Sequence, residues 1–135
     1  MHTFAGLTVA YWCVVVAALL PIVCAGIAKW GMFGTSRRDG GFDNHQPRSW
    51  LGSQSGWRAR ANAAQANSFE ALPFFIGAVI IAHQTGSLQV RVDMLALVFV
   101  LLRLVYILLY LADQANARSV VWALALVTNL SLLFV

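Results

Sequence analysis

The chain has 135 residues, of which 60% are hydrophobic and only 10% are charged. A typical soluble domain carries roughly 25% charged residues, and a chain this short has too much surface to cover with fewer. The composition therefore excludes an ordinary soluble domain and predicts a single all-α domain in a membrane. The net charge of +4 comes mostly from one loop rather than from a basic surface stripe, so no nucleic-acid partner is predicted.

Four apolar segments follow one another along the chain. The first covers about residues 7–30, and it lacks the basic start and short apolar core of a secretory signal. About 20 apolar residues suffice to cross the hydrocarbon, so this segment is long enough. Glycine, serine and charge dominate residues 31–57, which predicts a loop. Further spans are predicted over about 58–82, 94–112 and 117–135.

The predicted topology follows from the number of spans and from the basic residues. Four crossings place both termini on one side of the membrane. Arg118 lies in the third loop, on the same side as the first loop, whereas the second loop holds only Arg91. The basic residues in or beside the first loop are Lys29, Arg37, Arg38, Arg48, Arg58 and Arg60. The positive-inside rule then places loop 31–57 in the cytoplasm and both termini outside.

The second span carries polar residues along one helical face. At 100° per residue, Arg60, Ala63, Asn67, Glu70 and Phe74 fall within a stripe about 80° wide. The polar residues of the second span are therefore not scattered around the helix.

The third span repeats this arrangement with Arg103, Tyr106, Tyr110 and Asp113 on one face. A charge in the middle of a span needs a partner. Glu70 lies about 18 Å above Arg58, and Arg103 about 15 Å above Asp113, at a rise of 1.5 Å per residue. We therefore predict an ion pair between Glu70 and Arg103. Two interpretations stay open: a clamp that fixes helix register, or one wall of a cavity for a polar, anionic ligand.

Two quoted stretches carry a family resemblance. "RANAAQANSFEALPFF" together with "RLVYILLYLADQANARS" resembles the MAPEG family, the membrane-associated proteins of eicosanoid and glutathione metabolism. "LLPIVCAGIAKWG" and "FDNHQPRSWL" are similar to its bacterial branch. The resemblance covers nearly the whole chain and rests mainly on Asn-x-x-Glu followed shortly by proline in the second span.

The resemblance implies a four-helix integral membrane bundle that assembles as a homotrimer in a bacterial inner membrane, with glutathione bound between subunits in the cytoplasmic half. It implies that the guanidinium of Arg118, or a nearby serine, stabilises the glutathione thiolate, and we predict Arg118 for that role. The implied catalytic residues are Arg118, Tyr110 and Ser119. The implied glutathione-binding residues are Lys29, Arg60, Asn67, Glu70, Arg103 and Tyr106. No metal site is predicted, because the histidines lack metal-ligand spacing.

One position departs from the family pattern and leaves two functions open. Family enzymes place an arginine four residues before the asparagine, where this chain has Ala63, and Arg60 lies one turn lower as the candidate replacement. The first function is a glutathione-dependent transferase or peroxidase acting on hydrophobic electrophiles that arrive from the lipid. The alternative is a non-catalytic trimeric scaffold or lipid-binding protein without glutathione activity. The partners implied are further copies of the chain, membrane lipids and a hydrophobic small molecule.

Overall fold

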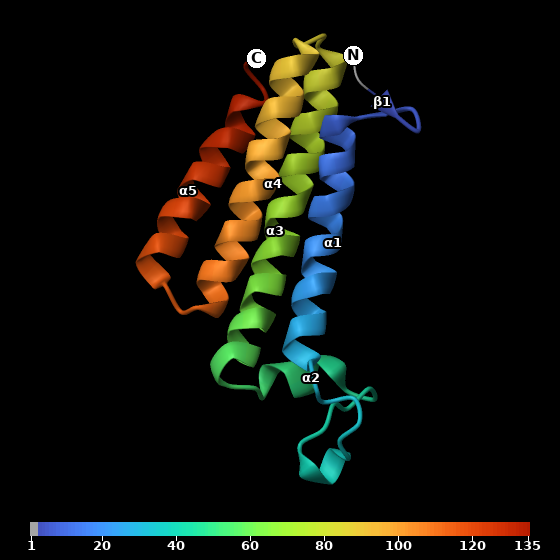
Figure 1. Ribbon diagram of the computed structural model, residues 1–135, viewed down its shortest axis with the longest axis vertical. Helices are drawn as coiled ribbons and strands as arrows, with labels where there is room; N and C mark the ends of the chain where they lie inside the picture. The colour runs from blue at the N-terminus through green and yellow to red at the C-terminus, as the bar shows by residue number, and fades with distance from the viewer. Residues whose placement is uncertain (1–2) are drawn as a thin grey trace.

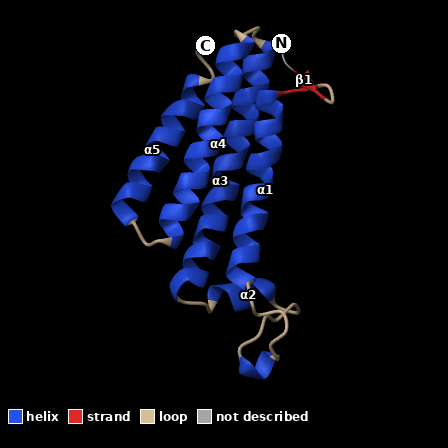
Figure 2. Ribbon diagram, in the orientation of Figure 1, coloured by secondary structure: helices blue, strands red, loops and turns tan. Residues whose placement is uncertain are grey.

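The computed structural model describes residues 3–135 and is helical apart from one small hairpin (Figures 1 and 2). Strands β1 (Thr3–Phe4) and β2 (Leu7–Thr8) pair antiparallel just before the first helix. The helices are α1 (Val9–Lys29), α2 (Pro47–Gly52), α3 (Gly56–Gln84), α4 (Gln89–Leu111) and α5 (Ala115–Ser131), with a short 3-10 helix at Arg37–Asp39.

Three helices form the body of the bundle, and the fourth long helix lies at its side. α1, α3 and α4 pack against one another, whereas α5 packs mainly on α4 and touches α3 at few positions. Figure 1 shows β1 and the C-terminus at one end, called here the termini end, and α2 at the other, called the loop end. The lower part of α5 diverges from α3 in this view, in line with the few contacts between these two helices.

Three of the helices are long and apolar enough to cross a membrane. These are α1, α3 and α4, with mean hydropathies of 2.3, 1.3 and 2.6 over their most apolar windows. α5 overlaps the fourth predicted span but has only 17 helical residues, or about 26 Å at 1.5 Å per residue. The structure thus shows an all-helical bundle with three helices of spanning length.

The segment predicted as a plain loop, 31–57, contains ordered structure. α2 begins at Pro47, which suits the first helical position because its missing N–H would have no partner there. Trp50 and Leu51 are buried at the loop end, where the Trp50 indole donates to the carbonyl of Gly40 at 3.2 Å. The loop prediction did not include α2, because polar composition alone does not report the helix start at Pro47.

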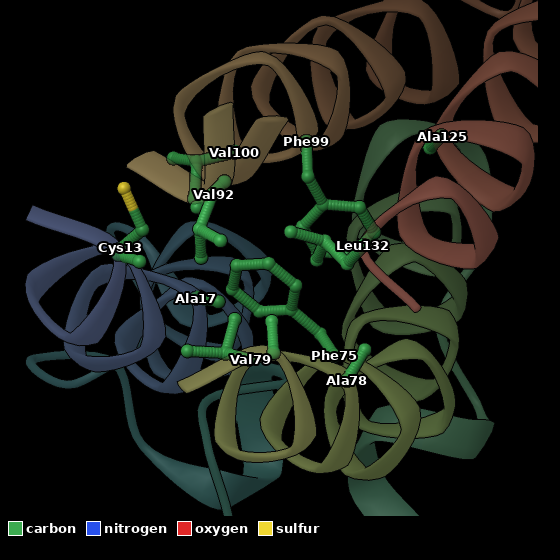
Figure 3. Packing of buried hydrophobic residues seen from close by; sticks show 13 residues of the cluster. Cys13, Ala17, Phe75, Ala78, Val79, Val92, Phe99, Val100, Ala125 and Leu132 are labelled. Atoms are coloured by element: carbon green, nitrogen blue, oxygen red, sulfur yellow. The ribbon is translucent and has the colours of Figure 1, made fainter. Parts of the chain in front are cut away.

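Among residues 3–135 the largest cluster of buried hydrophobic residues lies in the termini half of the bundle (Figure 3), and two smaller clusters follow toward the loop end. Phe75 of α3 is fully buried and stacks on Phe99 of α4, with ring centroids 4.1 Å apart. Leu132, just beyond α5, is also fully buried in this cluster. Leu132 therefore anchors the C-terminal end of α5 to the core.

A polar cluster ties three helices together at the termini end. The backbone N–H of Ala10 donates to Asp93 of α4 at 2.9 Å, which satisfies an orphan donor in the first turn of α1. His83 of α3 bonds the carbonyl of Val79 through Nδ1 at 2.7 Å and the hydroxyl of Thr8 through Nε2 at 2.8 Å. A carbonyl only accepts, so Nδ1 carries the proton, and in the neutral ring the Thr8 hydroxyl donates to Nε2.

Thr8 also caps α1, and its removal should loosen that end. Its hydroxyl accepts from the N–H of Tyr11 at 3.2 Å. We expect Thr8→Ala to lower the free energy of unfolding by about 1 kcal/mol and to accelerate hydrogen exchange at the Tyr11 amide. Exchange measured by mass spectrometry checks this, with Thr85→Ala as the control at an exposed hydroxyl. Unchanged exchange at Tyr11 would show that the cap contributes nothing.

Candidate functional site

A cavity of about 210 Å³ opens between α3, α4 and α5, where α5 diverges from α3. It is called here the α3–α5 cavity. Its lining residues are Asn67, Glu70, Ala71, Phe74, Phe99, Arg103, Trp122, Ala125, Leu126 and Asn129. Three members of the predicted polar stripe, Asn67, Glu70 and Phe74, therefore do face one cavity.

Arg103 contacts Asn67 rather than Glu70. Its guanidinium donates to the Asn67 side-chain carbonyl at 2.6 Å, and the arginine is only 2% exposed. Within residues 3–135 the one ion pair is Arg37–Asp43, so the predicted Glu70–Arg103 pair was wrong. The estimate of depth along the helices gave Glu70 and Arg103 a similar depth, and both line the cavity. Depth alone cannot decide whether the guanidinium contacts Glu70 or the neighbouring Asn67. Glu70 stays exposed on the single chain.

A series of arginine and tyrosine side chains runs from this contact toward the loop end. The Arg103 guanidinium lies 4.3 Å from the centre of the Tyr106 ring, and the Tyr106 and Tyr110 rings meet edge to face at 5.7 Å. The Arg118 guanidinium lies 3.9 Å from the Tyr110 ring centre. Each of these distances is within the range of a cation–π or aromatic contact. This series, from Asn67 to Arg118, is called here the arginine–tyrosine ladder.

The ladder has a buried end and an accessible end. Arg103 and Tyr106 are buried, whereas Tyr110 and Arg118 are half-buried. The accessible end therefore offers a guanidinium and a phenol side by side. An anion such as a thiolate or carboxylate is stabilised by such donors.

Three predicted site residues do not join the ladder or line the α3–α5 cavity. The Lys29 ammonium lies over the ring of Phe42 at 4.5 Å. The Nε of Arg60 donates to the Leu111 carbonyl at 3.2 Å, at the C-terminal end of α4. Ser119 is exposed and its hydroxyl donates to the Ala115 carbonyl, four residues earlier in α5, at 3.1 Å.

Seven of the ten lining residues were not among the predicted site residues, and Trp122 and Asn129 are the two of these seven whose side chains carry hydrogen-bonding groups. Asn129 is 3% exposed, and its side-chain carbonyl has no hydrogen-bond partner among residues 3–135. Trp122 lies seven residues earlier, so both share one face of α5. The polar Asn129 within an apolar run was the available signal, but asparagine in a span is also common as a contact between helices.

The fold and composition define an all-helical integral membrane protein with a polar site inside the bundle. The chain belongs to the MAPEG family, because the model of that family matches residues 9–135. This family includes glutathione transferases and peroxidases as well as other members. Comparison with curated proteins and with solved structures found no match.

Proposed function

We propose that the protein is a membrane glutathione transferase or peroxidase in which the thiolate of bound glutathione forms beside Arg118 and Tyr110. The observation that carries this proposal is the arginine–tyrosine ladder, which brings five of the predicted site residues into one continuous series. Family membership supplies the cofactor class. The accessible end of the ladder holds the Arg118 guanidinium and the Tyr110 phenol, and these two groups can bind an anion.

The chemistry follows from the ionisation of a thiol. A glutathione thiol becomes a strong nucleophile only as the thiolate. The Arg118 guanidinium favours the thiolate by charge, and the Tyr110 hydroxyl can donate a hydrogen bond to it. Asn67, Glu70 and Arg103 line the adjacent α3–α5 cavity and would orient the polar groups of the tripeptide. The thiolate would then form a C–S bond to a hydrophobic electrophile as a leaving group departs or an activated double bond opens. Alternatively, it would attack the O–O bond of a peroxide, which releases the alcohol and leaves a sulfenic acid that a second glutathione converts to the disulfide and water.

The exposed Glu70 supports assembly as a homotrimer. A carboxylate facing lipid at this depth is costly, so it needs cover from a polar ligand or from another copy of the chain. We infer that α5 is the fourth span, completed by the residues after Ser131, which places both termini outside and loop 31–57 in the cytoplasm. The site would then open toward the cytoplasm of a bacterial cell.

A specific observation favours the alternative, a trimeric scaffold or lipid-binding protein. Ala63 stands where family enzymes have an arginine, and Arg60 bonds the Leu111 carbonyl rather than lining the α3–α5 cavity. Glutathione would then lose one of its carboxylate partners. The difference between the two functions is thus whether glutathione binds at all.

The ultraviolet difference spectrum of glutathione separates the two. We expect purified protein in detergent to produce a thiolate band, and Arg118→Ala to abolish it because the stabilising charge is gone. Arg91→Ala, in the exposed first turn of α4 at the termini end, is the matched control and should keep the band. If the wild type gives no band and calorimetry detects no glutathione binding, the transferase proposal fails and the scaffold function stands.

A further inference from the structure

Arg60 of α3 contacts the end of α4. Its Nε donates to the backbone carbonyl of Leu111 at 3.2 Å, across 51 residues of sequence. Leu111 is the last residue of α4, and the carbonyls of a final helical turn have no partner inside their own helix. A cation at a helix C-terminus is also favoured by the helix dipole. Arg60 therefore supplies both a hydrogen bond and a charge to this helix end.

The Leu111 carbonyl lies between the two groups of the proposed thiolate site. Tyr110 immediately precedes it, and Arg118 follows seven residues later. The turn between them is closed by backbone hydrogen bonds, from Gln114 to the Leu109 carbonyl at 2.9 Å and from Arg118 to the Gln114 carbonyl at 2.9 Å. A turn so short and so closely bonded transmits a displacement of Leu111 to Arg118.

Few other contacts fix this corner of the bundle against α3. α5 itself touches α3 at few positions. The Leu111 side chain packs beside a small apolar cluster that includes Ala61 of α3, but apolar burial is non-directional and does not set the rotation of the helix end. A hydrogen bond weakens steeply as its angle closes, so the Arg60 bond does set that rotation.

We infer that Arg60 is a positioning residue: by fixing the end of α4 against α3, it holds the Arg118 guanidinium 3.9 Å from the centre of the Tyr110 ring. This role differs from the one that the family resemblance implies, in which Arg60 contacts glutathione in place of an arginine at Ala63. Arg60 does not line the α3–α5 cavity. The effect on the thiolate rests on the proposed function, whereas the attachment of α4 to α3 does not.

Two substitutions of Arg60 separate a hydrogen-bonding role from a role of the charge. In Arg60→Gln the amide Nε2 is attached to Cδ, as Nε is in arginine, so a donor is kept at the same point of the side chain while the charge is removed. In Arg60→Met a methyl group replaces that donor. Arg58→Met is the matched control, because Arg58 lies on the same helix and its Nη1 donates to a carbonyl of α1, that of Ala28, at 2.9 Å.

The first measurement is hydrogen exchange by mass spectrometry on the protein in detergent, without glutathione. We expect Arg60→Met to accelerate exchange at the hydrogen-bonded amides of residues 112–118 about five- to tenfold, the effect of losing one hydrogen bond. Arg60→Gln and Arg58→Met should exchange there at the wild-type rate. If Arg60→Met leaves these amides unchanged, the inference is overturned. If Arg60→Met does not fold, Arg60→Ser, which is too short to reach the carbonyl, replaces it.

The second measurement is the ultraviolet thiolate band of bound glutathione. We expect Arg60→Met to lower the thiolate fraction at a fixed pH about threefold, less than Arg118→Ala does, because the guanidinium is displaced rather than removed. The affinity for glutathione should change by no more than about twofold, and Arg60→Gln should keep both the band and the affinity. Faster exchange in Arg60→Met with an unchanged band would make Arg60 a structural contact only.

Two further outcomes separate this inference from the proposed function. A loss of glutathione affinity in both Arg60→Met and Arg60→Gln, with exchange at residues 112–118 unchanged, would make Arg60 a ligand of a glutathione carboxylate and overturn the inference. Failure of the proposed function gives a different result, the absence of a thiolate band in the wild type. The exchange comparison then decides by itself whether Arg60 holds the turn between α4 and α5.

Discussion

Replacing Asn67 by leucine should destabilise the protein by about 3–5 kcal/mol, because it leaves the Arg103 guanidinium buried without its hydrogen-bond acceptor. The arginine is 2% exposed, and Asn67 accepts from it at 2.6 Å. Apart from that bond, Arg103 has the Tyr106 ring at 4.3 Å, which cannot accept so strong a hydrogen bond. The unfolding free energy in mixed detergent micelles is the quantity to measure.

A double variant distinguishes the loss of the Asn67–Arg103 hydrogen bond from the cost of leaving the Arg103 charge buried without a partner. We expect Asn67→Leu combined with Arg103→Met to be more stable than Asn67→Leu alone, since a methionine in place of the charge needs no partner. Arg38→Met, in the exposed first loop, is the control and should change stability by about 0.5 kcal/mol or less. If the loss of unfolding free energy in the double variant equals the sum of the losses in the two single variants, the unpartnered Arg103 charge is not the cause of the instability of Asn67→Leu.

Replacing Phe75 by alanine should cost about 3–5 kcal/mol of unfolding free energy. Phe75 is fully buried at the centre of the core, where it stacks on Phe99 at 4.1 Å (Figure 3). Its removal leaves a void between α3 and α4, and the dispersion contacts along that void are lost whether the surroundings are water or lipid. The same micelle titration measures the loss.

Phe134 provides the matched control for the Phe75 variant. It is 84% exposed near the C-terminus, so Phe134→Ala should leave stability nearly unchanged. A large effect at both positions would mean that the assembled protein buries Phe134 as well. A small effect at both would show that the Phe75–Phe99 stack is not the centre of stability.

The broad architecture could be predicted from the sequence because it depends on long, strong patterns. Uninterrupted apolar runs indicated membrane helices, and helical periodicity correctly placed Asn67 and Glu70 on one cavity. The family resemblance is confirmed by the match over residues 9–135. These features are sums over many residues, so the error at any single position matters little.

The partners within the site could not be predicted in the same way. Which acceptor Arg103 meets depends on helix rotation and side-chain reach over a few ångströms, and the choice between Asn67 and Glu70 was wrong. Arg60 shares the periodic face of Asn67, yet its long side chain bonds the end of α4 instead. The cavity beside Asn129 arises from the divergence of α5 from α3, a tertiary feature with no local signal in α5 itself.

The attachment of α5 determines how the molecule can yield mechanically. One end of this helix is fixed by Leu132 in the core, while its other end is held against α4 by the contact between Arg118 and Tyr110. A force that widens the α3–α5 cavity therefore acts first on the few contacts between α3 and α5, and the packing of α1, α3 and α4 is separate from these contacts. α5 is thus joined to the bundle along α4 and at Leu132, and the width of the α3–α5 cavity depends on its few contacts with α3.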